Sequence, residues 1–260
     1  MAWLLVDNSN SRTKFALGDG DRLLDWRGVL PTADVNQDSL SDLLGFVSFS
    51  GSVVGSVVPE KAAELSRFLE TRGPCHLLDH GSPLGMAIDY PDPAGIGADR
   101  LANGVGAAVR HGVPAIVIDF GTAVTFDVIS AEPAYCGGVI APGLGAMTGY
   151  LARRTALLPV IELEEPASAI GKSTTHAMQA GAVFGYRGLV RGILEKIRAE
   201  LGGEPRIIAT GGDAALIARG MPEIEVVDPE ITLDGLRCIA RRVFMAGANE
   251  GPCTNIVITT

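Results

Sequence analysis

The chain of 260 residues is 47% hydrophobic and 20% charged, and its net charge is −9. This composition supplies a core for one large domain or two ordinary ones and argues against disorder. The acidic balance argues against a nucleic-acid-binding surface, which needs a basic patch. No apolar run approaches the ~20 residues of a membrane helix, and the N-terminus reaches Asp7 without the basic leader of a signal peptide. We therefore expect a cytoplasmic protein with no membrane or nucleic-acid partner.

The four cysteines and four histidines show no spacing that is typical of a zinc site. No two cysteines form a C-x-x-C pair, and His76 and His80 lie where a predicted strand runs into a loop. We interpret the cysteines as buried or inert thiols.

The first predicted element is a strand–turn–strand unit, "WLLVDNSNSRTKFALG", at residues 3–18. A short apolar strand ends at Asp7, a polar turn follows, and an alternating strand then begins. The stretch "AIVIDFGTAVTFDVI" at residues 115–129 repeats this pattern, with Asp119 standing 112 residues after Asp7. A pattern that occurs twice at this distance suggests two similar halves.

Strands and helices alternate along both halves of the chain. Apolar residues at helical spacing, followed by glycine, predict helices over 59–73 and 98–112. In the second half we predict a helix over 175–203, a strand over 206–210 and a last helix over 232–251. This alternation indicates α/β layers with largely buried sheets.

Each strand–turn–strand unit brings one carboxylate and several backbone amides to the same edge of a sheet. Phosphate oxygens approach backbone amides where side chains are small, and the acid can hold a cation directly or through its water. Either unit alone is also explained as an ordinary hairpin turn, because Asp, Asn, Gly and Ser are the usual turn residues. Two matched copies, one with Asp7 and one with Asp119, favour a phosphate and cation site.

Two further segments could carry chemistry. A strand that ends at Thr210 is followed by Gly211, Gly212 and a helix, which would let a ligand pack on bare backbone or would simply make a tight turn. In "YPDPAGIGADR", Asp99 and Arg100 open a helix behind a rigid loop. They are either a helix-terminal pair favoured by the dipole or a general base beside a phosphate clamp. Neither a G-x-G-x-x-G nor a P-loop pattern supports another nucleotide site.

Together these segments resemble the type III pantothenate kinases, of the superfamily that holds actin, heat-shock chaperones and the acetate and sugar kinases. The similarity runs nearly end to end, with "GSVVP", "GIGADR", "DFGTAVTFD", "GGVIAPG", "GKSTTHAMQAG" and "TGGD" in the family's order. It implies an α/β fold of two related actin-like (ribonuclease H-like) lobes, each a mixed sheet flanked by helices, with a cleft between them. We expect these lobes to be residues 1–112 and 113–260.

The resemblance implies ATP-dependent phosphorylation of pantothenate to 4′-phosphopantothenate, the first step of coenzyme A biosynthesis. It also implies a homodimer and, beside ATP, the cofactors Mg²⁺ and a monovalent cation, K⁺ or NH₄⁺. Two alternatives stay open: a non-catalytic regulator like the transcriptional accessory factors among the family's relatives, and a kinase of the same superfamily for another small substrate.

The resemblance also implies roles for individual residues of this sequence. Asp99 would be the base that takes the proton from the pantothenate hydroxyl. Asp7 would direct Mg²⁺ through water, and Asp119 would bind the monovalent cation. Pantothenate would contact Tyr90, Gly97, Ala98, Asp99, Arg100 and Thr174, and Thr174 could act from across a dimer interface. ATP would contact Asp7, Asn8, Ser9, Asn10, Ser11, Arg12, Thr13, Lys14, Thr122, Gly211 and Gly212.

Three positions depart from the family's pattern. The usual first loop is Asp-x-Gly-Asn-Thr, and here Ser9 replaces the glycine while Ser11 replaces the threonine and keeps its hydroxyl. Ser9 adds a side chain where phosphate would approach the backbone. Asp92 stands where the family often has asparagine, and an extra carboxylate near an anionic substrate is unfavourable unless a cation or hydrogen bond offsets it.

Overall fold

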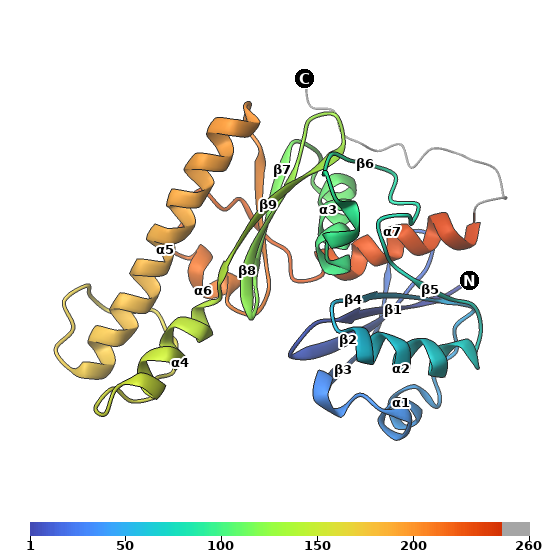
Figure 1. The fold of residues 1–260 in the computed structure, drawn as a ribbon, viewed down its shortest axis with the longest axis horizontal. Coiled ribbons are helices and arrows are strands. Elements are labelled where there is room, and N and C mark those ends of the chain that lie inside the picture. The colour runs from blue at the N-terminus through green and yellow to red at the C-terminus, as the bar shows by residue number, and fades with distance from the viewer. Residues whose placement is uncertain (246–260) are drawn as a thin grey trace. The chain divides into compact units, whose positions relative to one another are not determined.

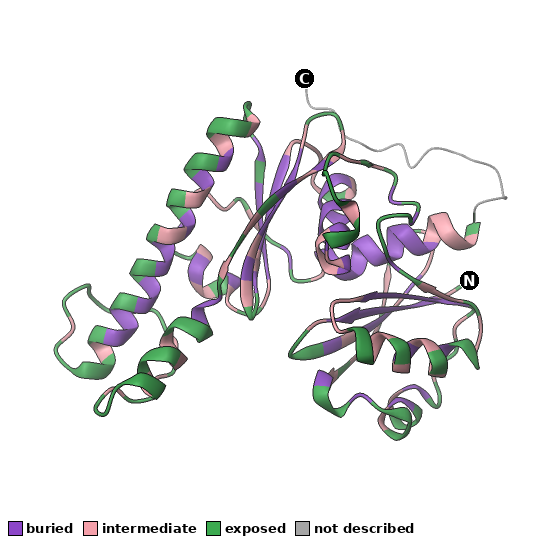
Figure 2. Ribbon diagram, viewed as in Figure 1, coloured by how far each residue is buried: buried purple, intermediate pink, exposed green. Residues whose placement is uncertain are grey.

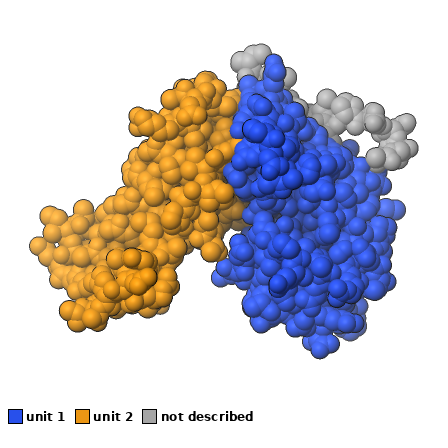
Figure 3. Space-filling view, viewed as in Figure 1, with its two compact units in different colours: residues 1–113, 129–136, 230–260 blue, residues 114–128, 137–229 orange. Residues whose placement is uncertain are grey.

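The computed structural model describes residues 1–245 and divides the chain into two compact units (Figure 3). Among the described residues, unit 1 comprises 1–113, 129–136 and 230–245, and unit 2 comprises 114–128 and 137–229. The end of the last predicted helix, residues 246–251, lies outside the described residues. In the described part of the chain, no helix is both long and apolar enough to cross a membrane.

Unit 1 is built on a five-stranded sheet with the order β3-β2-β1-β4-β5 (Figure 1). Strand β1 pairs antiparallel with β2 and parallel with β4. Strand β3 extends the antiparallel side and β5 the parallel side. The strands are β1 (Trp3–Asn8), β2 (Arg12–Gly18), β3 (Leu23–Pro31), β4 (Ser52–Ser56) and β5 (Cys75–Leu77).

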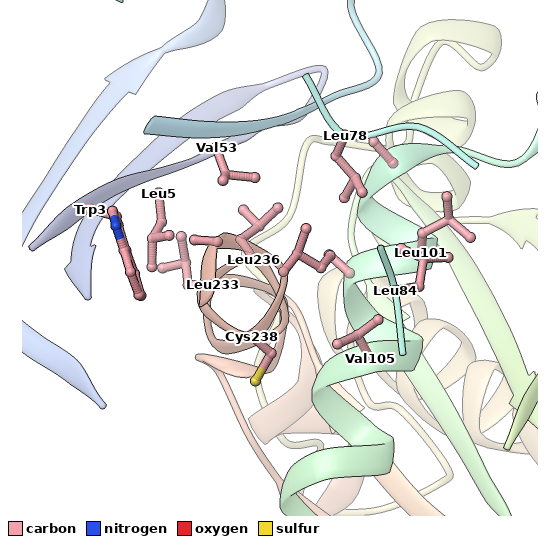
Figure 4. Packing of buried hydrophobic residues seen from close by; sticks show 14 of the residues in the cluster. Trp3, Leu5, Val53, Leu78, Leu84, Leu101, Val105, Leu233, Leu236 and Cys238 are labelled. Atoms are coloured by element: carbon pink, nitrogen blue, oxygen red, sulfur yellow. The ribbon is translucent and has the colours of Figure 1, made fainter. Parts of the chain in front are cut away.

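Two hydrophobic clusters cover the two faces of this sheet, because successive residues of a strand point to opposite sides. Leu4 and Val6 of β1 pack with the buried leucines of α1 and α2. Trp3 and Leu5 pack with α3 and α7 on the other face (Figure 4). The helices of unit 1 are α1 (Gln37–Leu44), α2 (Pro59–Glu70), α3 (Ala98–Arg110) and α7 (Ile231–Met245).

Helices α3 and α7 touch backbone to backbone. A Cβ atom added to Gly235 of α7 would lie 1.9 Å from the carbonyl oxygen of Ala102, and one added to Gly106 of α3 would lie 2.3 Å from that of Ile231. Both distances are far below a van der Waals contact, so a side chain at either position would force the helices apart. These glycines therefore fix the helix pair on which the Asp99 segment is built.

Unit 2 contains most of a six-stranded sheet with the order β11-β10-β7-β8-β9-β6. Strands β7, β10 and β11 are parallel to one another. The short strand β6 (Ala87–Ile88) and the part of β9 that pairs with it belong to unit 1. The remaining elements are β7 (Ala115–Phe120), β8 (Ala123–Ile129), β9 (Ala134–Pro142), α4 (Leu144–Arg154), α5 (Thr174–Leu201), β10 (Arg206–Thr210), α6 (Ala214–Ala218) and β11 (Val226–Val227).

The two sheets repeat one strand order. In both, three consecutive strands lie side by side, β1-β2-β3 and β7-β8-β9, and two strands parallel to the first of them lie on its other side; the second sheet adds β6 beyond β9. The central strands are β1, which carries Asp7, and β7, which carries Asp119. The predicted repeat and the predicted mixed sheets flanked by helices are thus confirmed.

The compact units differ from the predicted lobes in the place of the last helix. The sequence assigned residues 113–260 to one lobe, whereas α7 packs on β1, β4 and α3 of unit 1. Figure 2 shows that α3 and most of α7 are buried, while α4 is largely exposed. An apolar helical pattern predicts that a helix is covered, but it does not say by which sheet.

Candidate active site

Asp7 lies at the end of β1, where its carboxylate is only 3% exposed. Two neighbours engage its two oxygens: Ser9 Oγ donates a hydrogen bond to Oδ1 over 2.9 Å, and Lys14 Nζ lies 3.4 Å from Oδ2. Lys14 comes from the facing position of β2, which the antiparallel register places opposite Asp7. The carboxylate is therefore oriented and its charge balanced by residues of its own hairpin.

A chain of hydrogen bonds supports this hairpin. Asn8 Nδ2 donates to Thr13 Oγ1 over 2.7 Å, and Thr13 Oγ1 lies 3.1 Å from Thr32 Oγ1. Thr32 in turn donates to the carbonyl oxygen of Ser9 over 2.6 Å, so Thr13 must be the donor to Thr32. From the other side, Ser56 Oγ donates to Asn8 Oδ1 over 2.6 Å. The exposed residues at the hairpin tip are Asn10, Ser11 and Arg12.

Thr32 and Ser56 were not predicted from the sequence as site residues. Thr32 opens a short 3₁₀ helix after β3, and Ser56 ends β4. Each stands at the end of a strand in the same sheet as the hairpin, and this is the signal that could have identified them. Their hydroxyl groups satisfy buried polar groups that would otherwise be costly.

Asp99 and Arg100 stand in the first turn of α3. Asp99 is half-buried, and its Oδ1 accepts a hydrogen bond from the Arg100 backbone N–H over 2.8 Å. A Cβ atom on Gly97 would lie 2.6 Å from the same Oδ1, so only glycine leaves the carboxylate room there. Ala98 is buried and anchors the helix start in the core.

The Asp99 segment, at the start of α3, lies close to the Asp7 hairpin. The loop that follows β4 connects the two. Gly97 lies against Val57, since a Cβ on Gly97 would be 3.3 Å from Val57 Cγ1. The Val57 N–H donates to the carbonyl oxygen of Asn8 over 3.1 Å. The predicted base and the predicted Mg²⁺-directing acid therefore share one edge of the unit 1 sheet.

The predicted pantothenate loop joins β6 to α3. Tyr90 is 38% exposed, and a 3₁₀ helix at Pro93–Gly95 follows it. Ile96 then enters the core of unit 1, which fixes the end of the loop beside Gly97. The loop thus presents Tyr90 to solvent while its end leads directly into the Asp99 turn.

Asp119 occupies in unit 2 the place that Asp7 has in unit 1. It pairs in register with Thr210 of β10, and Gly211 follows with a φ of +92°. A Cβ on Gly211 would lie 2.5 Å from Asp119 Oδ1 and 2.6 Å from the Phe120 backbone nitrogen. Both the left-handed conformation and the missing side chain are required, so bare backbone faces this carboxylate.

Two more turns close around the Asp119 segment. A Cβ on Gly143 would lie 2.4 Å from the carbonyl oxygens of both Gly121 and Thr122. Gly121 and Thr122 are themselves exposed, as is Gly212. The predicted phosphate and nucleoside positions of unit 2 are therefore neighbours along two adjoining turns, and Gly143, the last residue of "GGVIAPG", packs against both Gly121 and Thr122.

Asp213 and Tyr186 add polar groups to this part of unit 2. Burial raises the pKa of Asp213 above its ordinary value of 3.8. Burial and the nearby Asp213 charge raise the pKa of Tyr186, so its hydroxyl stays neutral. That hydroxyl donates to the carbonyl oxygen of Pro142 over 3.2 Å, just before Gly143.

Thr174 lies at the exposed N-terminus of α5. Ser173 caps this helix by accepting from the His176 N–H over 3.2 Å. A Cβ on Gly171 would lie 2.4 Å from the Ala177 nitrogen, so the chain before the cap folds tightly against the first turn.

The acids of the two clusters are suited to the implied ions. Residues 1–245 contain no group of three or more His, Cys, Asp or Glu side chains that could hold a metal ion alone. Mg²⁺ is usually held by one or two carboxylates together with substrate phosphates, which fits Asp7. At Asp119, the carboxylate packs against the backbone of Gly211 and Phe120, and its negative charge suits a cation.

Comparison with known proteins gives sequence matches over most of the chain. The sequence model of the family described as type III pantothenate kinase matches residues 3–196. A type III pantothenate kinase of Akkermansia muciniphila is 56% identical over 240 residues, covering 92% of this chain and 98% of the relative. One of Methylacidiphilum infernorum is 43% identical over 241 residues, covering 91% and 87%.

Solved structures share the fold at low sequence identity. A putative 2-dehydro-3-deoxygalactonokinase of Sinorhizobium meliloti aligns with a TM-score of 0.62 and 14% identity, covering 93% of this chain and 99% of the other. A putative Baf family transcriptional activator of Campylobacter jejuni aligns with a TM-score of 0.58 and 19% identity, with the same coverage. These likenesses confirm the actin-like and sugar kinase-like fold, and the sequence matches show that the chain belongs to the type III pantothenate kinase family.

Proposed function

We propose that this protein phosphorylates pantothenate with ATP to give 4′-phosphopantothenate and ADP, the first step of coenzyme A biosynthesis. The observation that carries this proposal is the nearly full-length similarity to curated type III pantothenate kinases. The gathering of Asp7 and Asp99 at one sheet edge supports it independently. Phosphoryl transfer depends mostly on positioning and on charge stabilisation, which is what these supported acids supply.

In the proposed reaction, Asp99 takes the proton of the pantothenate hydroxyl as that oxygen attacks the γ-phosphorus of ATP. The bond from the γ-phosphorus to the β–γ bridging oxygen breaks, and ADP leaves with that oxygen. Arg100, the next residue, holds the transferred phosphoryl group through its guanidinium donors. Tyr90 and the Gly97–Ala98 backbone orient pantothenate against Asp99.

We assign the triphosphate to the hairpin tip and to the turns of unit 2. Lys14 and the exposed Asn10–Arg12 segment would contact phosphate oxygens. Thr122 would contact phosphate as well, and Gly211 and Gly212 would lie under the nucleoside. Bound Mg²⁺ at Asp7 and K⁺ or NH₄⁺ at Asp119 would neutralise the charge of the triphosphate. In an acidic chain with few placed cations, these ions replace basic side chains.

We propose a homodimer whose interface is the exposed face of α5. Four glycines at helical spacing, Gly181, Gly185, Gly188 and Gly192, have open space where their side chains would lie. Phe184 is 37% exposed on the same face. Thr174 precedes Gly181 by about two helical turns and therefore lies on this face as well. Bare glycines let a second helix approach closely, and the neighbouring helix α4 adds exposed apolar side chains. These are Met147, Tyr150 and Leu151.

Light scattering after gel filtration tests this interface. The native protein should elute at twice its chain mass of 27.0 kDa. Gly185→Leu places a bulky side chain on the face and should shift the protein towards the monomer. Glu204→Leu adds the same side chain at an exposed loop position and should leave the dimer intact. A native protein of 27.0 kDa in solution would refute the dimer.

We propose a cytoplasmic enzyme without a nucleic-acid or membrane partner, because ATP is available there and the net charge is −9. A coupled assay of ADP release, with pantothenate, Mg²⁺ and K⁺, tests the activity. Asp99→Asn should lower kcat by about 10²–10⁴-fold, as expected for loss of a general base. Folded native protein without pantothenate-dependent turnover would disprove the function, and a panel of other hydroxyl substrates would then identify the acceptor.

A further inference from the structure

Tyr135 of β9 is a fully buried tyrosine (0% exposed) that the sequence did not single out. The Arg100 guanidinium carbon lies over its ring, 5.7 Å from the ring centroid. This distance is within the range in which the negative face of an aromatic ring attracts a cation. A ring-face contact holds the charge of the guanidinium without consuming an N–H donor as a hydrogen bond would. The contact with Tyr135 can therefore hold Arg100 without competing for the N–H donors that bind phosphate oxygens.

The backbone of the same residue holds the substrate loop. The Tyr135 carbonyl oxygen accepts a hydrogen bond from the Asp89 N–H over 2.9 Å, and Tyr135 pairs in register with Ile88 of β6. Asp89 immediately precedes Tyr90, the exposed aromatic residue of the loop. Tyr135 is thus tied through its backbone to the beginning of the pantothenate loop and through its ring to Arg100 beyond the loop's end.

The packing of the Tyr135 ring depends on Gly104 of α3. A Cβ at Gly104 would lie 3.4 Å from Tyr135 Cδ2 and 2.9 Å from Met86 Cε. A larger residue there would displace Met86, which leads into β6, and would press on the ring. The helix that begins with Asp99 and Arg100 is therefore shaped, one turn further on, to receive this tyrosine.

We propose that Tyr135 is a positioning residue of the phosphoryl-transfer site, which fixes Arg100 against the transferred phosphate and sets the start of the pantothenate loop. This inference rests on the proposed function. A core residue would contribute to stability alone, whereas a positioning residue must also act on catalysis through Arg100. The distinction is measurable because the ring-face contact and the burial of the ring can be altered separately.

Two substitutions separate these roles. Tyr135→Phe keeps the ring face and is the reference against which the loss of the ring is measured. Tyr135→Leu keeps an apolar residue but removes the ring face, and should lower kcat/KM by about 10–30-fold, as expected for a largely desolvated cation–π contact. Trp3→Leu removes another buried ring from the same cluster, without the Arg100 contact, and should lower the Tm while leaving kcat/KM unchanged.

A double-mutant cycle tests whether Tyr135 acts through Arg100. In an Arg100→Ala background, Tyr135→Leu should change kcat/KM by less than about two-fold. An equal loss in both backgrounds would overturn the proposal and leave Tyr135 a core residue. If native protein shows no turnover, the proposed function fails first; if it turns over and Tyr135→Leu matches it, only the inference about Tyr135 fails.

Phenylalanine analogues at position 135 keep the experiment decisive if Tyr135→Leu does not fold. Successive fluorine atoms weaken the negative face of the ring with little change of its shape. We expect kcat/KM to fall stepwise with fluorination while the Tm stays nearly constant. A constant kcat/KM along this series would overturn the role of the ring face.

Discussion

The Asp7 cluster and the Asp119 cluster stand at equivalent places in two sheets of the same strand order, yet their surroundings differ. Asp7 is buried and engaged by the side chains of Ser9 and Lys14. Asp119 is less buried and faces the bare backbone of Gly211. The first carboxylate is oriented by side chains of its own hairpin, whereas the second packs closely against main chain.

This difference suggests a division of roles within one repeated architecture. A carboxylate whose two oxygens are already engaged acts best indirectly. It binds a water molecule of an ion that phosphate groups also bind. A carboxylate packed against main chain lies near carbonyl oxygens, and carboxylate and carbonyl oxygens together can bind a poorly hydrated monovalent ion directly. The following substitutions test whether the two acids differ in this way.

The largest effect should follow from removing Asp119. We expect Asp119→Ala to lower kcat by about 10³-fold, because an ion that stabilises developing charge is lost with its ligand. The native enzyme should also lose most activity when K⁺ is replaced by Na⁺, while Asp119→Ala should respond little to this exchange. Steady-state kinetics at constant ionic strength measure both. Full activity of the native enzyme in Na⁺ would remove the monovalent-ion role from Asp119.

A second test introduces a side chain at Gly211, beside Asp119. Gly211→Ala introduces a Cβ at 2.5 Å from the carboxylate and forces a left-handed φ of +92°. We expect the free energy of unfolding to fall by about 2–4 kcal/mol from strain and overpacking. At Gly212 a Cβ would meet nothing within 4 Å, so Gly212→Ala should leave stability nearly unchanged. Equal unfolding curves for the two variants would contradict the close backbone approach.

A third test loosens Asp7. Ser9→Ala removes the hydroxyl that donates to Oδ1 over 2.9 Å, and a hydrogen bond to a charged group contributes about 1.5–3 kcal/mol. Because part of this is recovered by solvent, we expect the Mg²⁺ concentration for half-maximal activity to rise by about 3–10-fold. The K⁺ requirement should not change, since K⁺ is assigned to the other cluster. A shift in both requirements would show that the two acids do not act separately.

The local structure of both clusters could be predicted from the sequence, because it depends on residues close together in the chain. The acid-ended strands, the strand before Gly211 and the helix ending at Gly112 are all found as expected. Gly112 has a φ of +85°, and its N–H closes the end of α3 on the Ala107 carbonyl. Local patterns of this kind carry their own physical signal.

What the sequence could not supply is the pairing of distant segments. Thr32 lies 19 residues from Thr13, and Ser56 lies 48 residues from Asn8. Tyr135 meets Arg100 only because β6 pairs with β9. No local periodicity encodes such a strand pairing, and no local pattern predicted against which sheet α7 would pack. The helices α1 and α4 were missed for a related reason, since each is short and weakly covered.

The smallest effect concerns Asp213, the acid beside the Asp119 cluster. Among the described residues no hydrogen bond or ion pair to its carboxylate is found, in contrast to Asp7, and burial raises its pKa above 3.8. A carboxyl whose pKa is higher in the folded state binds its proton more tightly there, so stability declines as the pH rises from 3.8 through the folded pKa. Asp213→Asn should therefore raise the Tm at pH 7 but not at about pH 3.

Because Asp213 is only half-buried, solvent screening should keep this gain below about 1 kcal/mol. Thermal unfolding across pH 3–7 measures it, with Asp42→Asn at an exposed position of α1 as the control. If Asp213→Asn instead lowered the Tm at pH 7, the charged carboxylate would have to be stabilised in the fold. Asp213 would then be a second carboxylate, after Asp7, that the fold stabilises in its charged form. The two clusters would then differ less in how they stabilise an acid than the close approach of Gly211 to Asp119 indicates.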